Sequence, residues 1–179
     1  MINPYQIIEK YYAPFPELHR LLIKHSEQVK NKAIEITIKH PELCADKNFI
    51  AEAAMLHDIG VFLCDAPKIF CYGTHHYIEH GYLGADILRK EGLEKHARVC
   101  ERHTGTGFTK EKIIEKNLPL PHRDMRPVSI EEEIICYADK FFSKSRPDVM
   151  NDLERIRQSI EKHDESNLQY FEEWHARFS

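Results

Sequence analysis

Residues 51–60, "AEAAMLHDIG", place a histidine and an aspartate at the end of an apolar run. The small and apolar side chains before them favour a short buried helix over residues 48–58. His57 and Asp58 then stand side by side where the core should continue. Taken alone, the pair could be a helix end whose side chains satisfy backbone groups. Its meaning therefore depends on the other polar residues that share apolar faces.

Apolar residues recur at helical spacing along most of the chain. No segment alternates with the two-residue period of a strand over a useful length, so we expect one all-α domain over residues 1–179. Prolines exclude a regular helix over residues 117–127, and residues 64–79 lack a clean period, so both are expected to be loops. The spacing predicts helices in these segments: 4–12, 18–40, 48–58, 80–91, 93–104, 109–117, 129–142, 153–160 and 168–178.

Composition limits the classes of partner. The net charge of −4 argues against a general nucleic-acid binder, although a local cationic site could still hold a small anion. The five cysteines are odd in number and form no CxxC pair, which favours a reducing compartment over a disulfide framework. We find no signal-peptide pattern at the N-terminus and no apolar run near the roughly 20 residues that span a bilayer. A cytoplasmic protein without membrane contact is expected.

Two further polar residues lie on apolar helical faces. His25 shares a stripe with Leu22 and Val29, and Asp139 lies within "IICYADKFF" at 134–142. A buried carboxylate is costly unless it is paired, hydrogen-bonded or bound to a metal. His25 alone would be read as a hydrogen-bonded core histidine. Together with His57 and Asp58, the economical explanation is that two imidazoles and two carboxylates meet at one divalent ion.

His80 and His103 extend this pattern. Each stands at an end of a predicted helix, beside glycines or close to an apolar face. They could hold a second metal ion, with Asp58 bridging the two ions. Alternatively, they could bind a substrate phosphate beside a single ion. Either one considered singly could also be a surface histidine.

The order of these residues, H…HD…H…H…D, resembles the HD superfamily of metal-dependent phosphohydrolases, and "HDIG" at 57–60 resembles its HDIG subgroup. The resemblance implies a single compact helical bundle of the HD-domain type. Its core would span about residues 18–146, with C-terminal helices at 148–178 packed on it. By position, the resemblance implies that four residues bind a first metal: His25, His57, Asp58 and Asp139.

Three segments are similar to the HD branch that splits diadenosine tetraphosphate symmetrically, and to other prokaryotic HDIG phosphohydrolases. They are "HGYLGADIL" at 80–88, "ERHTG" at 101–105 and "YADKFFSKSRP" at 137–147. Many HDIG proteins have a lysine where this chain has Val61, and the segment from Phe108 to Pro127 is longer than in that branch. Both departures concern the substrate and leave the ligand set intact.

The resemblance implies hydrolysis of a phosphoester or phosphoanhydride, with a nucleotide as the expected substrate. The cofactor would be one or two divalent ions among Fe, Mn, Zn, Mg and Ni. Asp58, His80 and His103 are the expected catalytic residues. Five further residues are candidates for binding the substrate phosphate: Arg102, Lys140, Lys144, Arg146 and His76. The alternative for each of them is an ordinary polar residue on the solvated surface.

Two other functions are compatible with the pattern. Some HD-fold proteins with a similar six-ligand pattern are mixed-valent di-iron oxygenases. A non-catalytic nucleotide sensor would need the fold and only part of the ligand set. We rank both below hydrolysis of a small phosphorylated substrate. The C-terminal stripe that ends in Trp174 and Phe178 either completes the core or forms a homodimer contact.

Overall fold

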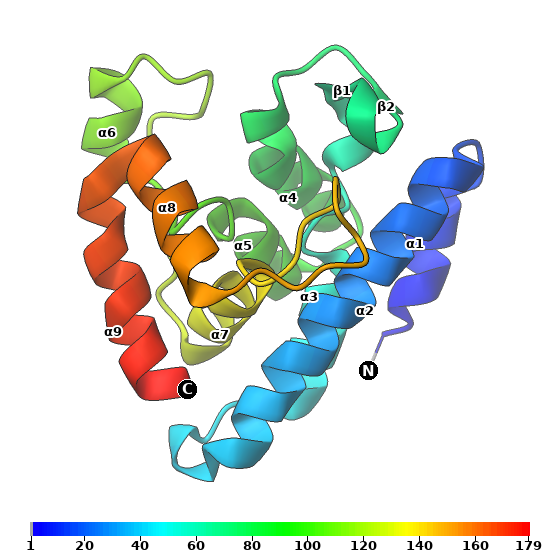
Figure 1. The fold of residues 1–179 in the computed structure, drawn as a ribbon. Coiled ribbons are helices and arrows are strands. Elements are labelled where there is room, and N and C mark those ends of the chain that lie inside the picture. The colour runs from blue at the N-terminus through cyan, green and yellow to red at the C-terminus, as the bar shows by residue number, and fades with distance from the viewer. Residues whose placement is uncertain (1) are drawn as a thin grey trace.

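The computed structural model describes residues 2–179, apart from the side chains of residues 163 and 164. The fold is all-α, as predicted. In Figure 1, α1 and α2 lie on one side of the molecule, α8 and α9 lie on the other, and α3, α5 and α7 lie between them. The described residues form these helices: α1 (Pro4–Tyr12), α2 (Pro16–Lys39), α3 (Lys47–Leu56), α4 (His80–Lys90), α5 (Glu94–Arg102), α6 (Lys110–Glu115), α7 (Ile130–Asp139), α8 (Leu153–Asp164) and α9 (Leu168–Phe178).

Helix starts follow local sequence signals. Proline stands in the first turn of α1 and of α2, where the missing N–H costs no hydrogen bond. Asp46 caps α3 by accepting hydrogen bonds from the backbone N–H groups of Asn48 and Phe49. The Ser129 hydroxyl likewise accepts from Glu132 at the start of α7.

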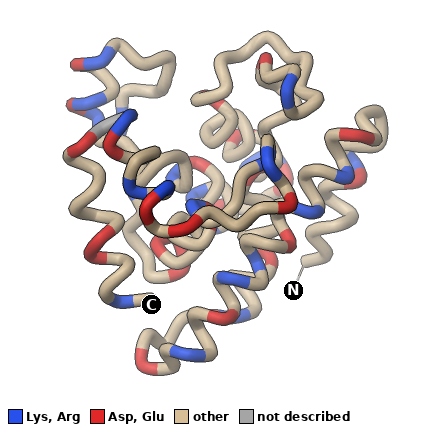
Figure 2. Tube along the Cα trace, viewed as in Figure 1, with Lys and Arg blue, Asp and Glu red and all other residues tan. Residues whose placement is uncertain are grey.

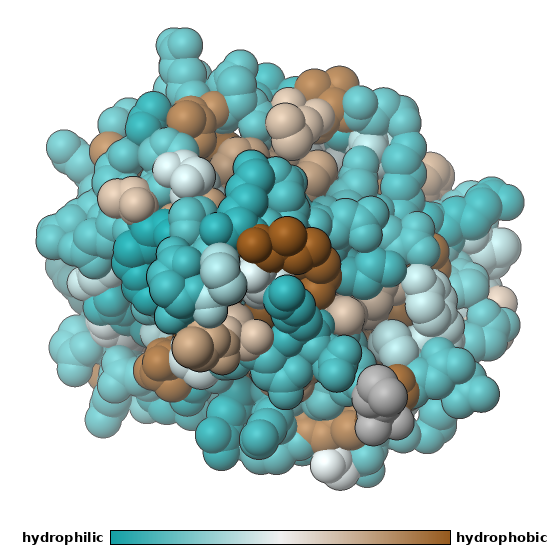
Figure 3. All heavy atoms as spheres, turned by 90° about the horizontal axis from the view of Figure 1, so that it is seen from below, coloured by the Kyte–Doolittle hydropathy of each residue, from teal (hydrophilic) through white to brown (hydrophobic). Residues whose placement is uncertain are grey.

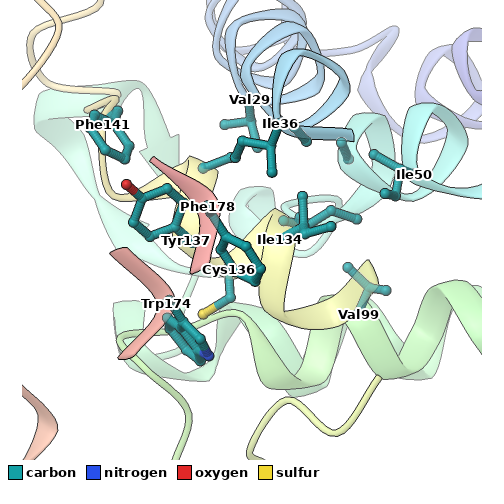
Figure 4. Packing of buried hydrophobic residues seen from close by; sticks show 14 of the residues in the cluster. Val29, Ile36, Ile50, Val99, Ile134, Cys136, Tyr137, Phe141, Trp174 and Phe178 are labelled. Atoms are coloured by element: carbon teal, nitrogen blue, oxygen red, sulfur yellow. The ribbon is translucent and has the colours of Figure 1, made fainter. Parts of the chain in front are cut away.

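Two apolar clusters hold the bundle together. One joins α2, α3 and α7 with the C-terminal helices, and Figure 4 shows Val29, Ile36, Ile50 and Ile134 meeting there, with Trp174 and Phe178 beyond them. The other cluster joins α1, α2 and α3 to α4 and α5. The two clusters share α2 and α3, so these helices are packed against apolar residues on two sides. This packing fixes the positions of α2 and α3 relative to their neighbours.

Glycine allows α4 to approach the turn after α3. A Cβ at Gly60 would lie 2.3 Å from the His80 carbonyl oxygen and 2.5 Å from the Gly84 nitrogen. The backbone of Gly60 is right-handed, with φ at −85°, so close approach rather than a left-handed helix end accounts for this glycine. This contact places His80 next to the HD pair.

Residues 61–79 are more ordered than the predicted loop. They contain the short 3₁₀ helices η2 (Val61–Leu63), η3 (Pro67–Ile69) and η4 (Tyr77–Glu79). Between them, β1 (Asp65–Ala66) and β2 (Cys71–Tyr72) form an antiparallel pair. Such short elements depend on a few local backbone hydrogen bonds, which leave no apolar period in the sequence. Two further 3₁₀ helices are η1 (Pro41–Leu43) and η5 (Glu165–Asn167).

The surface is mainly hydrophilic on the face shown in Figure 3, where hydrophobic residues form small separate patches. Acidic and basic residues are scattered over the whole trace in Figure 2, and its described part has no segment made up of basic residues alone. Among residues 2–179, no helix is long and apolar enough to cross a membrane.

Candidate metal centre

Three of the predicted ligands lie at the C-terminal ends of helices. His57 follows the last residue of α3, His103 follows the last residue of α5, and Asp139 is the last residue of α7. The helix predicted over residues 48–58 therefore ends two residues earlier than expected, at Leu56. The partial negative charge at a helix C-terminus attracts a cation, so three converging ends favour a positive ion between them.

The first ligand group consists of His25, His57, Asp58 and Asp139. Their ligand atoms all lie within 4.8 Å of one another. The Nε2 atom of His25 is 3.1 Å from Asp58 Oδ2 and 3.1 Å from Asp139 Oδ1. His57 Nε2 is 3.0 Å from Asp58 Oδ2 and 3.6 Å from Asp139 Oδ1. Two nitrogens and two carboxylate oxygens therefore surround one small volume.

The second ligand group consists of Asp58, His80 and His103. The Nε2 atoms of both histidines lie 3.3 Å from Asp58 Oδ1 and 3.0 Å from each other. Asp58 is fully buried between the two groups, with Oδ2 facing the first and Oδ1 facing the second. A carboxylate in this position can bridge two ions.

Backbone carbonyls orient three of the imidazole rings. The Nδ1 atom of His57 lies 2.6 Å from the Ala54 carbonyl oxygen, and that of His103 lies 2.7 Å from the Cys100 oxygen. His80 Nδ1 is 2.5 Å from the Tyr77 oxygen. Since a carbonyl only accepts, each Nδ1 carries a proton, and in the neutral form of each ring Nε2 is the nitrogen with the lone pair. Such a partner on the other ring nitrogen is typical of metal-binding histidine.

Several nitrogen and oxygen atoms of the two ligand groups are buried without a hydrogen-bond partner among the described residues, as expected for metal ligands. Among the described residues, Nε2 of His25, Nε2 of His57 and both Asp58 oxygens are buried without a hydrogen bond. Their contacts have ion-pair distances but lack the directions of hydrogen bonds. Buried unpaired groups of this kind are costly unless an ion satisfies them. The set of imidazoles and carboxylates therefore fits a divalent metal.

The two ligand groups differ in their electrostatics. Burial opposes charge on His57, but the carboxylates of Asp58 and Asp139 outweigh it and raise the pKa of His57 to about 9. Burial lowers the pKa of His80 to about 3, and it also lowers the pKa of His103. Although burial opposes their ionisation, Lys144 and Lys140 hold the pKa values of Asp58 and Asp139 well below the usual range.

Two lysines border the centre. The Nζ atom of Lys144 lies 2.5 Å from Asp58 Oδ2, and that of Lys140 lies 2.9 Å from Asp139 Oδ2. Burial opposes charge on both amines, yet the neighbouring carboxylates raise the pKa of each. Both are therefore charged at neutral pH and stand where an anion would approach the ligands.

The other predicted phosphate-binding residues have different partners. Arg102 donates from Nη1 to both carboxylate oxygens of Glu132, at 3.0 and 2.9 Å. The Glu132 carboxylate also accepts from the Val128 backbone N–H. Arg146 donates to the Asn151 side chain, at 2.5 Å. His76 is exposed and caps η4.

Tyr77 is a neighbour of the centre that the residue pattern did not reveal. Its ring stacks on His80 with 4.7 Å between centroids, and the Lys144 ammonium lies 5.9 Å from the same ring. Its carbonyl also orients His80. The only available signal was its position three residues before a ligand, the same spacing that joins Ala54 to His57.

Comparisons with known proteins match this geometry to a family. A family model described as HD domain matches residues 22–143. The chain is 34% identical over 145 residues to an uncharacterized protein of Methanocaldococcus jannaschii, covering 79% of this chain and 78% of that protein. No solved structure matches the chain.

Two further relatives are longer proteins. A tRNA (cytidine(56)-2'-O)-methyltransferase of Picrophilus torridus is 33% identical over 83% of this chain, and one of Thermoplasma volcanium is 36% identical over 68%. The chain spans only 37% and 32% of their lengths. The family match contains both ligand groups and covers more than half of the sequence. The chain belongs to the HD domain family.

Proposed function

We propose that this chain is a metal-dependent hydrolase of a phosphoester or phosphoanhydride, with a nucleotide as substrate. The observation that supports this most is the position of Asp58, which offers one carboxylate oxygen to each ligand group. Members of the HD family generally are hydrolases, and the family membership of the chain agrees with the proposal. The imidazole nitrogens favour Fe, Mn, Zn or Ni over Mg.

A divalent ion bound here would lower the pKa of a bound water and neutralise charge on a phosphate group. The chain's own residues would then bind and orient the reactants. Asp58 stays deprotonated because its pKa is low, so it can accept a hydrogen bond from the attacking water. The neutral Nε2 atoms of His80 and His103 keep lone pairs for an ion or for a proton.

Lys140 and Lys144 would meet the phosphate. Their ammonium groups lie beside Asp139 and Asp58, so a phosphate oxygen at the ligands would come within reach of both. Each amine would neutralise charge that builds up on the phosphate in the transition state. Arg102 and Arg146 have other partners in the structure, which makes them weaker candidates for this role.

Methyl transfer is a less suitable proposal for this chain. The two relatives named for it share only about a third of their length with the chain. Most of the HD match necessarily falls within the part aligned with the Picrophilus torridus protein, since that alignment covers 83% of this chain. A small phosphorylated substrate also agrees better with the net charge of −4 than a nucleic acid does.

The test is a screen of nucleotides and other phosphate esters with Mn²⁺ or Fe²⁺, run with and without oxygen. We expect released phosphate or nucleotide product in both atmospheres, because hydrolysis consumes only water. A reaction that requires oxygen would instead support a di-iron oxygenase. Tight nucleotide binding without turnover under any condition would support a sensor.

A further inference from the structure

A cavity of about 420 Å³ lies beside the ligand groups, and Lys140 is the one described residue of its lining that has a role in the proposed chemistry. Two of its lining residues directly follow predicted ligands in the sequence, Thr104 after His103 and Lys140 after Asp139, and a third, Tyr77, stacks on the ring of His80. A group bound in this cavity can therefore be joined directly to a phosphate at the ligands.

The walls of this side cavity are largely apolar. Ile78, Phe108 and Leu118 form one part, and Ile160 of α8 contributes from the C-terminal region. Backbone hydrogen bonds between Phe108 and Met125, 3.2 and 2.8 Å long, hold the Phe108 wall in place. Residue 160 lies outside the family match at 22–143, so part of the wall comes from a segment that the family match does not cover.

Two hydroxyl groups in the wall, those of Thr104 and Thr106, have no hydrogen-bond partner among the described residues. Thr106 lines the cavity and is 2% exposed, and its hydroxyl forms no hydrogen bond with any described residue. Asn167 lines the same cavity. A ligand with both a flat apolar face and hydrogen-bonding edges would satisfy these groups and the apolar walls together. An alkyl chain would leave the Thr106 hydroxyl unpaired.

We infer that the side cavity binds the nucleoside part of the substrate, and that its residues select which base is accepted. This rests on the proposed function. The base would lie against the Phe108 ring, with its edge toward Thr106, and the phosphate would lie beside Lys140 and the ligands. The volume falls in the range of about 300–1,000 Å³ typical of small-molecule sites. It suits a mononucleotide better than a dinucleoside polyphosphate, whose second nucleoside would lie outside it.

The test uses two neighbouring positions of α8. Ser159 lines the side cavity and is exposed, whereas Gln158 is exposed and lies outside the cavity lining. Ser159→Trp should fill the cavity mouth without burying the new ring in the core, and Gln158→Trp is the matched control. A third variant, Thr106→Val, removes the more deeply buried of the two unpartnered hydroxyls while keeping the shape of the side chain.

Binding of free adenosine, guanosine, cytidine and uridine is measured by calorimetry, without any turnover. We expect at least one nucleoside to bind the wild type. Ser159→Trp and Thr106→Val should each weaken that binding by on the order of tenfold, and Gln158→Trp should leave it unchanged. If no nucleoside binds, or if Ser159→Trp binds like the wild type, the inference is wrong.

Hydrolysis separates this inference from the proposed function. Acetyl phosphate has a leaving group too small to need the cavity, so Ser159→Trp should still hydrolyse it while losing activity toward the nucleotide. Nucleoside binding without hydrolysis of any phosphate ester would overturn the proposed function and leave the cavity assignment standing. Equal loss of activity toward both substrates, with nucleoside binding intact, would overturn the cavity assignment alone.

Discussion

The two ligand groups share Asp58 but differ in everything else around it. The first group adds Asp139 and two histidines, and the pKa of one of them, His57, is raised to about 9. The second adds two histidines and no further carboxylate, and the pKa of His80 is lowered to about 3. A cation in the first group would therefore be held strongly by charge. In the second group a cation would meet only neutral imidazole nitrogens besides Asp58. Its affinity there would depend more on other ligands bound at the same place.

The largest expected effect comes from Asp58→Asn, because this change removes the carboxylate that both groups use. Metal content should fall at both groups, and hydrolysis should fall by about a thousandfold or more. Asp86→Asn, at an exposed position of α4, is the matched control and should keep the wild-type metal content. If Asp58→Asn keeps full metal content and activity, the proposed centre is wrong.

Single histidine changes should separate the two groups. His103→Ala should reduce the metal content from two ions toward one and lower activity by about a hundredfold, because the first group stays complete. His25→Ala should instead reduce binding of the more tightly held ion. Elemental analysis measures both, with the exposed His122→Ala as control. Unchanged metal content in His103→Ala would make His80 and His103 substrate ligands or bystanders.

A smaller effect is expected at Lys144, which contacts Asp58 without being a metal-binding residue type at neutral pH. Lys144→Met removes a charge beside the phosphate position and should raise the KM by about tenfold. Steady-state kinetics with Lys24→Met as control measures this, since Lys24 pairs with Asp148 elsewhere. An increase in activity would mean that the Lys144 ammonium competes with the metal for Asp58.

The smallest expected effect is the release of one proton from His57 when a metal binds. Because the pKa of His57 is raised to about 9, the metal-free protein holds a proton there at pH 7. A metal can bind Nε2 only after that proton leaves, so affinity should rise by up to about tenfold per pH unit below pH 9 and level off above it. Calorimetry in buffers of different ionisation enthalpy measures the released proton. The second group should release none from His80 in the same range.

Much of the centre could be predicted because its residues conflict with their surroundings. His25 and Asp139 are polar groups on apolar faces, and the cost of burying them points to a shared ion. The structure brings His25, His57, Asp58 and Asp139 together, and their roles as ligands stay predictions. Helical periodicity likewise predicted the all-α fold, since each amphipathic face must be buried against another.

Features that depend on contacts between distant segments could not be predicted in this way. Arg102 stands next to His103 in the sequence, yet its side chain pairs with Glu132, thirty positions away. The side cavity is lined by both Phe108 and Ile160, which are 52 positions apart, and no local pattern links them. The short elements within residues 61–79 rest on individual backbone hydrogen bonds, which apolar spacing does not report.

The central claim is that one carboxylate, Asp58, serves two metal-binding groups. Metal content per chain, measured by elemental analysis of anaerobically loaded wild type, Asp58→Asn and His103→Ala, tests it most directly. The account predicts two ions in the wild type, about one in His103→Ala and almost none in Asp58→Asn. Equal metal content in all three proteins would contradict it.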